Sequence, residues 1–314
     1  MKKIISILLV FATVVLLAVS CGPVDTTAIK IGVLNGPTGM GMAQLIDENK
    51  DNEDKYIFTN YASPDLAIPL LMKGELDMLC LPTNVAALQA EKLDVSVIAI
   101  NCLGSLYLLT DSKTTVSSIE DLDGKTIYTS VANSTTVPIL NYIFDSVDID
   151  VKIEVMADHP ALAAAVANNE VSIAVLPEPM ASTAITNAQA KGNTYTIDLN
   201  ISQEWDKVSD TPLAMGCIVV KNSFLAEHKS VVDSFLNDYK DSIEYINNKD
   251  NFESAVDMIV KAGITPKEAL AKSALANLYG SIVYIDGDDM KTTLVGFYNA
   301  IGQALPKDDF YYEK

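Results

Sequence analysis

The sequence predicts an α/β fold built as two doubly wound lobes, and three observations support this prediction. Segments with the apolar pattern of strands alternate with segments whose apolar residues recur at helical spacing, along nearly the whole chain. Polar residues follow the predicted strands, as is typical of parallel sheets that bind ligands at the carboxyl ends of their strands. The length of 314 residues corresponds to roughly two domains of about 150 residues each.

The first twenty residues have the composition of an export signal. Lys2 and Lys3 precede an apolar run at 4–19, and Ser20-Cys21-Gly22 follows it. The small residues before Cys21 resemble the lipobox of bacterial lipoproteins, in which the cysteine becomes the lipidated N-terminal residue. We therefore expect a signal peptide at 1–20, a lipidated tether at 21–27 and an extracytoplasmic protein anchored to the bacterial cell membrane through Cys21. An uncleaved anchor helix is the alternative, although about 16 apolar residues are fewer than the roughly 20 that span a bilayer.

The first predicted strand and turn, at 29–45, organise the rest of the chain. The strand stops at the turn Asn35-Gly36-Pro37-Thr38-Gly39, and a helical pattern begins at Met42. Glycines allow the backbone to turn sharply and to approach a ligand, and the first N–H groups of a helix have no earlier partner. The spacing of Gly36, Gly39 and Gly41 fits neither common nucleotide-binding loop. We expect a small-molecule site here, with a merely connecting turn as the alternative.

The remaining elements continue the alternation, which predicts parallel sheets. In the first unit we expect strands at 56–60, 77–81 and 95–100 and helices at 64–73 and 85–91. In the second unit we expect a capping box at 117–120, strands at 106–110, 125–129, 151–155, 171–176 and 195–199, a helix headed by 133–136, and helices at 160–168 and 180–190. A strand at 213–220 then returns to the first unit, followed by a long helix at 223–247, a helix opened by a capping box at 265–268 and a last helix at 288–304.

The charge of the chain excludes some partners. The formal net charge of −19 repels nucleic acid and anionic lipid headgroups. All 22 basic residues are lysines, so no planar bidentate arginine clamp can hold a carboxylate, sulfonate or phosphate. A ligand held in that way is therefore disfavoured.

The cysteines and histidines indicate neither a disulfide framework nor a metal site. Cys80, Cys102 and Cys217 lie in apolar, strand-like stretches and are odd in number, so we expect them to be buried and unpaired. His159 and His228 lie far apart without metal-ligand spacing. No Cys-His or Ser-His-Asp arrangement is visible, so we expect no catalytic residue, no metal and no cofactor.

Several stretches together resemble the type II solute-binding proteins of ABC importers, in the branch related to nitrate, sulfonate, riboflavin and thiamine-pyrimidine binders. The resemblance covers nearly the whole exported chain. The stretches that carry it are Lys30 to Gly41, Leu76-Asp77-Met78 leading to Pro82-Thr83-Asn84, Ile119 to Thr126, Val171 to Pro179, and Leu213 to Lys221 with the helix behind it.

The resemblance implies a type II periplasmic-binding-protein fold, with two lobes that close over a central ligand cleft. The first lobe is expected to comprise 28–107 and 213–314, and the second lobe 108–212. The crossings between them are expected near 104–110 and 205–213. The implied partners are the ABC permease and ATPase subunits, with the chain itself a monomer.

The resemblance also implies which residues bind the ligand. Glu178 can accept a hydrogen bond from an amino or ring N–H group, or it can serve as a cap or hinge-side carboxylate. Tyr61 can stack on an aromatic ligand or pack in the core. The full expected set is Asn35, Gly36, Thr38, Gly39, Asn60, Tyr61, Thr83, Asn84 and Asn101 on the first lobe, and Asn133, Ser134, Thr135 and Glu178 on the second.

The expected function is therefore a receptor without chemistry of its own. Because these side chains are mostly neutral, we favour a neutral or cationic heterocycle such as a thiamine-pyrimidine or flavin-type precursor. A small oxyanion held at helix N-termini is the alternative ligand class. An enzyme related to thiamine-pyrimidine or menaquinone synthesis is a less favoured alternative, because such enzymes work in the cytosol. A sensor or adhesion lipoprotein without a transporter is a third.

Overall fold

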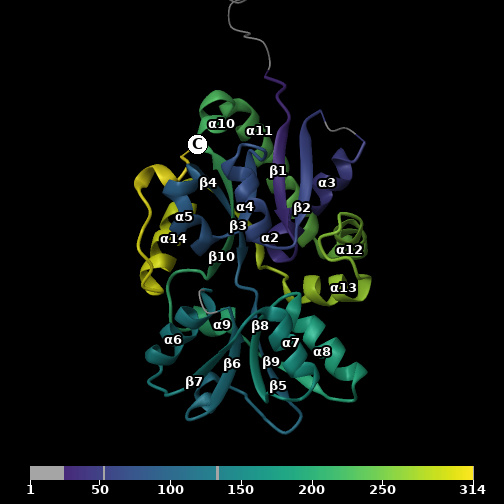
Figure 1. Cartoon of the computed structure of the whole chain (residues 1–314), viewed down its shortest axis with the longest axis vertical. Helices are drawn as coiled ribbons and strands as arrows, with labels where there is room; N and C mark the ends of the chain where they lie inside the picture. Colours follow the sequence, from purple (N-terminus) through teal and green to yellow (C-terminus); the bar gives the residue numbers. More distant parts are fainter. Residues whose placement is uncertain (1–24, 52–53, 132–133, 314) are drawn as a thin grey trace, which may run out of the picture.

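Two α/β lobes are stacked along the long axis of the molecule (Figure 1). The structure is a computed structural model that describes residues 25–51, 54–131 and 134–313. We call the part built on the six-stranded sheet β11-β4-β10-β3-β1-β2 the first lobe, and the part built on the five-stranded sheet β7-β6-β8-β5-β9 the second lobe. The expected α/β fold of two lobes is thus confirmed.

The sheet of the first lobe is mixed rather than parallel. Its strands are β1 (Ile29–Leu34), β2 (Tyr56–Tyr61), β3 (Met78–Pro82), β4 (Val95–Leu103), β10 (Ala214–Lys221) and β11 (Ile282–Ile285). β1 pairs in parallel with β2 and β3, whereas β10 is antiparallel to both β3 and β4, and β11 is antiparallel to β4. The prediction of a parallel sheet was wrong because β10 enters from the second lobe. It starts at the edge where β3 and β4 end, so it must run in the opposite direction.

Helices cover both faces of this sheet. Gly39 lets α2 lie directly on β1, because a Cβ atom there would be 2.1 Å from the carbonyl oxygen of Leu34. The helices are α2 (Pro37–Met40), α3 (Ala43–Asn49), α4 (Pro64–Met72), α5 (Thr83–Leu93), α10 (Asn222–Glu227), α11 (Lys229–Asn247), α12 (Phe252–Lys261), α13 (Glu268–Asn277) and α14 (Gly287–Ala300), with 3₁₀ turns η2 (Lys249–Asn251) and η3 (Asp308–Phe310).

The sheet of the second lobe is also mixed. β6 pairs in parallel with β7 and β8, while β5, which arrives from the first lobe, is antiparallel to β8 and β9. The strands are β5 (Leu106–Asp111), β6 (Thr126–Ser130), β7 (Lys152–Met156), β8 (Ile173–Pro177) and β9 (Tyr195–Asn200). The helices are η1 (Ile119–Leu122), α6 (Thr136–Ser146), α7 (His159–Ala167), α8 (Met180–Ala190) and α9 (Ile201–Asp206).

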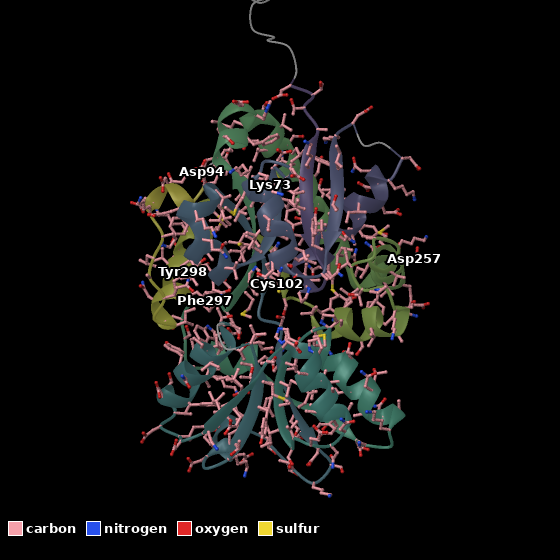
Figure 2. All side chains as sticks on the ribbon, in the orientation of Figure 1. Lys73, Asp94, Cys102, Asp257, Phe297 and Tyr298 are labelled. Atoms are coloured by element: carbon pink, nitrogen blue, oxygen red, sulfur yellow. The ribbon has the colours of Figure 1, made fainter. Side chains whose placement is uncertain are left out.

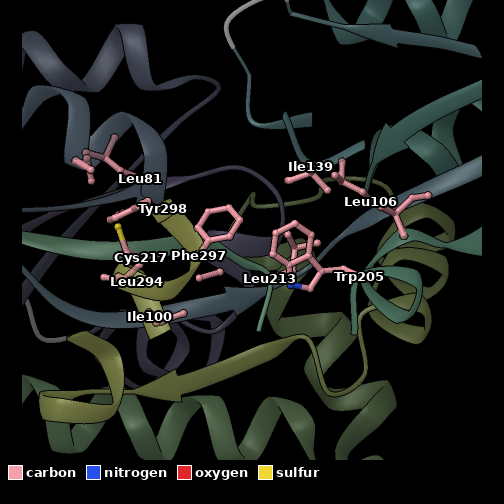
Figure 3. Packing of buried hydrophobic residues seen from close by; sticks show 14 of the residues in the cluster. Leu81, Ile100, Leu106, Ile139, Trp205, Leu213, Cys217, Leu294, Phe297 and Tyr298 are labelled. Carbon is pink, nitrogen blue, oxygen red and sulfur yellow. The ribbon is translucent and has the colours of Figure 1, made fainter. Parts of the chain in front are cut away.

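One apolar core runs through both lobes beside the crossings of the chain. Trp205 of α9 is fully buried, and its ring lies 4.7 Å from that of Tyr142 on α6 and 5.9 Å from that of Phe297 on α14, between centroids. The indole N–H donates to the carbonyl of Thr211 at 2.6 Å. Figure 3 shows Trp205 and Phe297 among buried residues of both lobes, including Leu81 and Ile139. The two lobes therefore share packing at this side and not only two chain crossings.

The expected long helix at 223–247 is broken at His228. The backbone there has φ −128° and ψ 35°, so α10 ends and α11 begins on either side of it. The His228 ring contacts Asp25 at 2.7 Å, from Nδ1 to the carboxylate, and packs on Phe224. The break thus fastens the start of the described chain to the first lobe. The predicted apolar stripe is confirmed within α11, whose buried residues include Val232, Phe235, Leu236, Tyr239 and Ile243.

Both predicted capping boxes were misplaced. The box in the second lobe uses Ser118 with Asp121, one residue later than expected, because the turn begins at Ile119. The box at 265–268 was wrong, since α13 begins after Lys267, which makes no side-chain cap. A capping pattern in sequence therefore located each turn to within a few residues but did not identify the capping side chain.

The three cysteines in the described chain are buried and free, as expected. Burial raises the pKa of the Cys80 and Cys102 thiols to about 12, and that of Cys217 further still. The thiolate is the reactive form, so native chain comprising residues 22–314 should not react with a thiol-specific chromogenic reagent at about pH 8. After denaturation all three thiols should react. Rapid reaction of any thiol in the native state would contradict the packing of these strands.

Within the described ranges, no helix has both the length and the apolar character needed to cross a membrane. The expected signal peptide and the proposed lipidation residue Cys21 lie outside the described residues.

Candidate ligand-binding site

The strand ends of the two lobes face each other. β1 and β3 end at the edge of the first lobe where β10 begins, and β6 and β8 end at the opposing edge of the second lobe. The two lobes approach each other closely at three places near these edges. A Cβ atom on Gly36 would lie 3.4 Å from Pro179 Cδ, Thr135 Oγ1 lies 3.8 Å from Met215 Sδ, and the Asn277 amide donates to Glu178. The expected ligand residues that follow these strands are thereby brought together between the lobes.

The glycine-rich turn is built for close approach between the lobes. Gly36 has φ +99° and is buried against Pro179 and the Glu178 carbonyl, so a side chain there would be strained. Asn35 is exposed, and Thr38 is half-buried. The turn therefore presents backbone and small polar groups to the second lobe.

Thr83 and Asn84 begin α5 at the same edge but differ in their hydrogen bonds. The Thr83 hydroxyl donates to the Ala214 carbonyl at 2.6 Å, and its own carbonyl accepts from Tyr298 at 2.9 Å. Asn84 is 7% exposed, yet its side chain forms no hydrogen bond with another described residue. Since no other described residue uses this amide, Asn84 has hydrogen-bonding capacity left for a ligand.

Asn101 leaves an acceptor unused at the end of β4. Its amide N–H groups point to the Thr38 carbonyl at 3.2 Å and to Cys80 Sγ at 3.8 Å. Its Oδ1 is buried without a well-aligned donor among the described residues. Burial raises the pKa of the nearby Tyr239 hydroxyl, although a hydrogen bond with the Asn101 side chain opposes that shift. Gly216 makes room for Asn101 Oδ1, since a Cβ atom there would lie 2.6 Å from this oxygen.

Asn60 and Tyr61, at the end of β2, are engaged within the first lobe. The Asn60 amide donates to the carbonyl of Ala262, beyond α12. Tyr61 packs against the apolar residues of the lobe, and its ring lies beside Gly32 of β1. Tyr61 therefore packs within the first lobe, and its stacking on an aromatic ligand stays a prediction.

On the second lobe, Ser134 and Thr135 lead into α6, while Asn133 lies outside the described residues. The Ser134 hydroxyl donates to the Ser130 carbonyl at 3.3 Å. Thr135 is 8% exposed, and its hydroxyl contacts Met215 Sδ of the first lobe. Val131 has φ +66°, a strained conformation for a β-branched residue that is found most often near functional sites.

Three hydrogen bonds from the chain itself hold the Glu178 carboxylate. Its carboxylate is 2% exposed and accepts from Ser182 N at 3.2 Å, Ser182 Oγ at 2.9 Å and Asn277 Nδ2 at 2.5 Å. Burial raises the pKa of Glu178, although the three hydrogen bonds oppose that shift. The cap role that the sequence left open is therefore present, and Asn277 adds a partner from the other lobe.

Sequence reasoning missed two residues at this interface and one contact within the second lobe. Met215 and Asn277 belong to no motif and meet the second lobe only in three dimensions. The missed contact, of 2.6 Å, joins Ser130 Oγ and His159 Nδ1, at the ends of β6 and β7. Burial lowers the pKa of His159, and Ser130 is fully buried, so this pair presents an uncharged imidazole at the edge of the second lobe.

A family model described as menaquinone biosynthesis matches residues 55–282. The chain belongs to this family. No curated protein matches it. The matched region begins before β2 and ends in β11, so it contains all the described site residues except those of the glycine-rich turn.

Several solved structures are similar to this member of the menaquinone biosynthesis family. One is of an ABC transporter protein from Parabacteroides distasonis, with 20% identity, a TM-score of 0.73 and coverage of 92% of this chain and 99% of that chain. Another is the ligand-binding component of an ABC-type import system from Staphylococcus aureus with zinc bound, at 15% identity, TM-score 0.68, and 91% and 97% coverage. A third is the periplasmic aliphatic sulphonate binding protein of Escherichia coli, at 13% identity, TM-score 0.66, and 92% and 95% coverage. These likenesses show the type II periplasmic-binding-protein fold.

No group of three or more metal-ligating side chains comes together in the part of the chain that the structure describes.

Proposed function

We propose that the chain is an extracytoplasmic solute-binding lipoprotein of an ABC importer, anchored through Cys21, that captures a neutral heterocycle between its lobes. The observation that carries the proposal is the unused hydrogen-bonding capacity of two uncharged amides at the edge of the first lobe: Asn101 Oδ1 is buried without a well-aligned donor among the described residues, and the Asn84 side chain, 7% exposed, bonds to no other described residue. The export signal and the fold shared with import proteins support the same role. An ABC permease and ATPase would receive the ligand.

The charge distribution supports an uncharged ligand over an oxyanion. The expected ligand residues include no lysine, the chain has no arginine, and Glu178, their only carboxylate, is already bonded to Ser182 and Asn277. An anionic group of a ligand would therefore meet no opposite charge in this set, whereas a cationic group would meet only the Glu178 carboxylate, whose partners Ser182 and Asn277 are neutral. The pyrimidine and flavin-type precursors that we favour can instead exchange hydrogen bonds with amides and hydroxyls.

A thermal-shift screen tests this proposal directly. Residues 22–314, which contain the whole described structure, are heated with vitamins, nucleobases, amino acids, sulfonates and oxyanions. A ligand that binds only the native state adds about 2.7 kcal/mol at a hundredfold excess over Kd, so a selective rise in Tm is expected with a neutral heterocycle. A selective shift with sulfonates or oxyanions alone would contradict the proposed ligand class.

An enzyme of menaquinone synthesis is the second candidate, because the family match favours it. The Ser130–His159 pair, in which Ser130 is buried and His159 half-buried, is the described feature that would suit it best. The two candidates differ in the fate of the bound molecule: a receptor releases it unchanged, whereas an enzyme releases a product of different composition.

A further inference from the structure

Five polar residues join the second lobe to α13 of the first lobe. Tyr107, Glu178 and Ser182 come from the second lobe, and Ser273 and Asn277 come from α13. The Asn277 amide donates to the Glu178 carboxylate at 2.5 Å, the Tyr107 hydroxyl donates to the Asn277 carbonyl at 2.6 Å, and the hydroxyls of Ser182 and Ser273 lie 2.8 Å apart. We call these five residues the interlobe latch.

The central groups of the latch are shielded from water. Glu178 is 2% exposed and Tyr107 is 3% exposed. A hydrogen bond to a buried carboxylate is stronger than one between neutral groups, because little water competes for it. We call the arrangement in which α13 contacts the second lobe closed. The Asn277–Glu178 bond therefore stabilises this closed arrangement more than a surface contact would.

The latch can open without leaving a buried charge unpartnered. Two of the three bonds to Glu178 come from Ser182, which lies four residues away on α8 of the same lobe. Separation of the lobes would break only the bonds to α13 and would let water replace them. In this arrangement Oε1 accepts from the Ser182 hydroxyl and Asn277, and Oε2 accepts from the Ser182 backbone N–H, so the chain itself positions the carboxylate.

We propose that Asn277 and Glu178 hold the two lobes closed in the absence of ligand, and that they are positioning residues for closure rather than ligand contacts. This inference extends the proposed receptor function, because the fraction of closed chain scales the apparent ligand affinity. Loss of one charge-assisted hydrogen bond should raise the ratio of open to closed chain about tenfold.

Distance measurements on the ligand-free chain test the latch. Spin labels are placed on residues 22–314 at D257C on α12 and Q189C on α8, two exposed sites on opposite lobes. Figure 2 shows Asp257 on the outer side of the first lobe. The native cysteines in the described chain are buried and should not be labelled. Double electron–electron resonance should give one short distance for the parent. In N277A, a second, longer distance should appear, with the open-to-closed ratio increased about tenfold.

N168A is the matched control. Asn168 also ends a helix and also donates to a glutamate, Glu170 at 3.0 Å, but both residues belong to the second lobe. N168A should keep the distance distribution of the parent. The latch is overturned if N277A keeps the parent distribution, or if N168A opens the chain as much as N277A does.

Y107F provides a second variant should N277A fold poorly. It keeps the buried ring and removes only the hydroxyl that donates to Asn277, so it should also populate the longer distance, to a smaller extent. A Y107F chain with only the short distance would argue against the latch. Since no ligand is used, these outcomes are independent of whether the screen finds one, and failure of the receptor proposal remains distinguishable from failure of the latch.

Discussion

Replacement of Trp205 with alanine should lower the free energy of unfolding by about 3–5 kcal/mol, the range measured when a large buried aromatic is truncated. The ring is fully buried between Tyr142 of the second lobe and Phe297 of the first, so the cavity would open in packing that both lobes share. The indole bond to the Thr211 carbonyl would also be lost, leaving that acceptor with the Ser209 hydroxyl as its donor. Urea unfolding followed by circular dichroism measures the effect.

W205F is the control for this prediction. Phenylalanine keeps an aromatic ring between Tyr142 and Phe297 but cannot donate to Thr211, so its loss of stability should be clearly smaller. Equal effects of the two variants would mean that the hydrogen bond, and not the shared packing, dominates. An unchanged W205A midpoint would contradict the apolar core that joins the lobes.

Replacement of Asn84 with alanine should weaken binding of the ligand found by the thermal-shift screen by roughly tenfold, the value of one well-buried hydrogen bond. The stability of the ligand-free chain should hardly change, because the Asn84 side chain bonds to no other described residue. Alanine is also favourable in a helix, so α5 loses nothing locally. Isothermal titration calorimetry measures the Kd for the ligand, and thermal unfolding without ligand measures the stability of the ligand-free chain.

T83A, at the residue next to Asn84, is the control for this prediction. The Thr83 hydroxyl is used within the first lobe, where it donates to the Ala214 carbonyl, so T83A should lower the stability of the ligand-free chain. An N84A chain that binds as tightly as the parent would show that the ligand lies elsewhere. An N84A chain that is as unstable as T83A would show that Asn84 serves the fold.

The fold was predictable where local patterns decide it. Strands, turns and amphipathic helices followed from apolar periodicity, and the buried cysteines followed from their apolar neighbours. The direction of β10 and the break at His228 were not predictable in this way. The first depends on where the chain returns from the second lobe, and the second on a contact with Asp25, about two hundred residues earlier.

The candidate site was predictable in its outline but not in the roles of its residues. Polar residues after strand ends were expected to meet, and Gly36, Asn84, Asn101 and Thr135 do lie at the facing edges of the lobes. Nothing in the sequence separated Asn84, whose side chain is free, from Thr83, whose hydroxyl is used. Asn277 carries no motif and reaches Glu178 only through the fold, so the latch could not have been found from periodicity or spacing.

The most direct test of the receptor proposal is the identity of what the chain releases. Residues 22–314 are incubated with the heterocycle that gives the largest thermal shift, freed of unbound compound by size exclusion and then denatured. Mass spectrometry of the released material should recover the same heterocycle, unaltered and in stoichiometric amount. Recovery of a compound with a different mass would contradict the receptor proposal and would favour an enzyme of the menaquinone biosynthesis family.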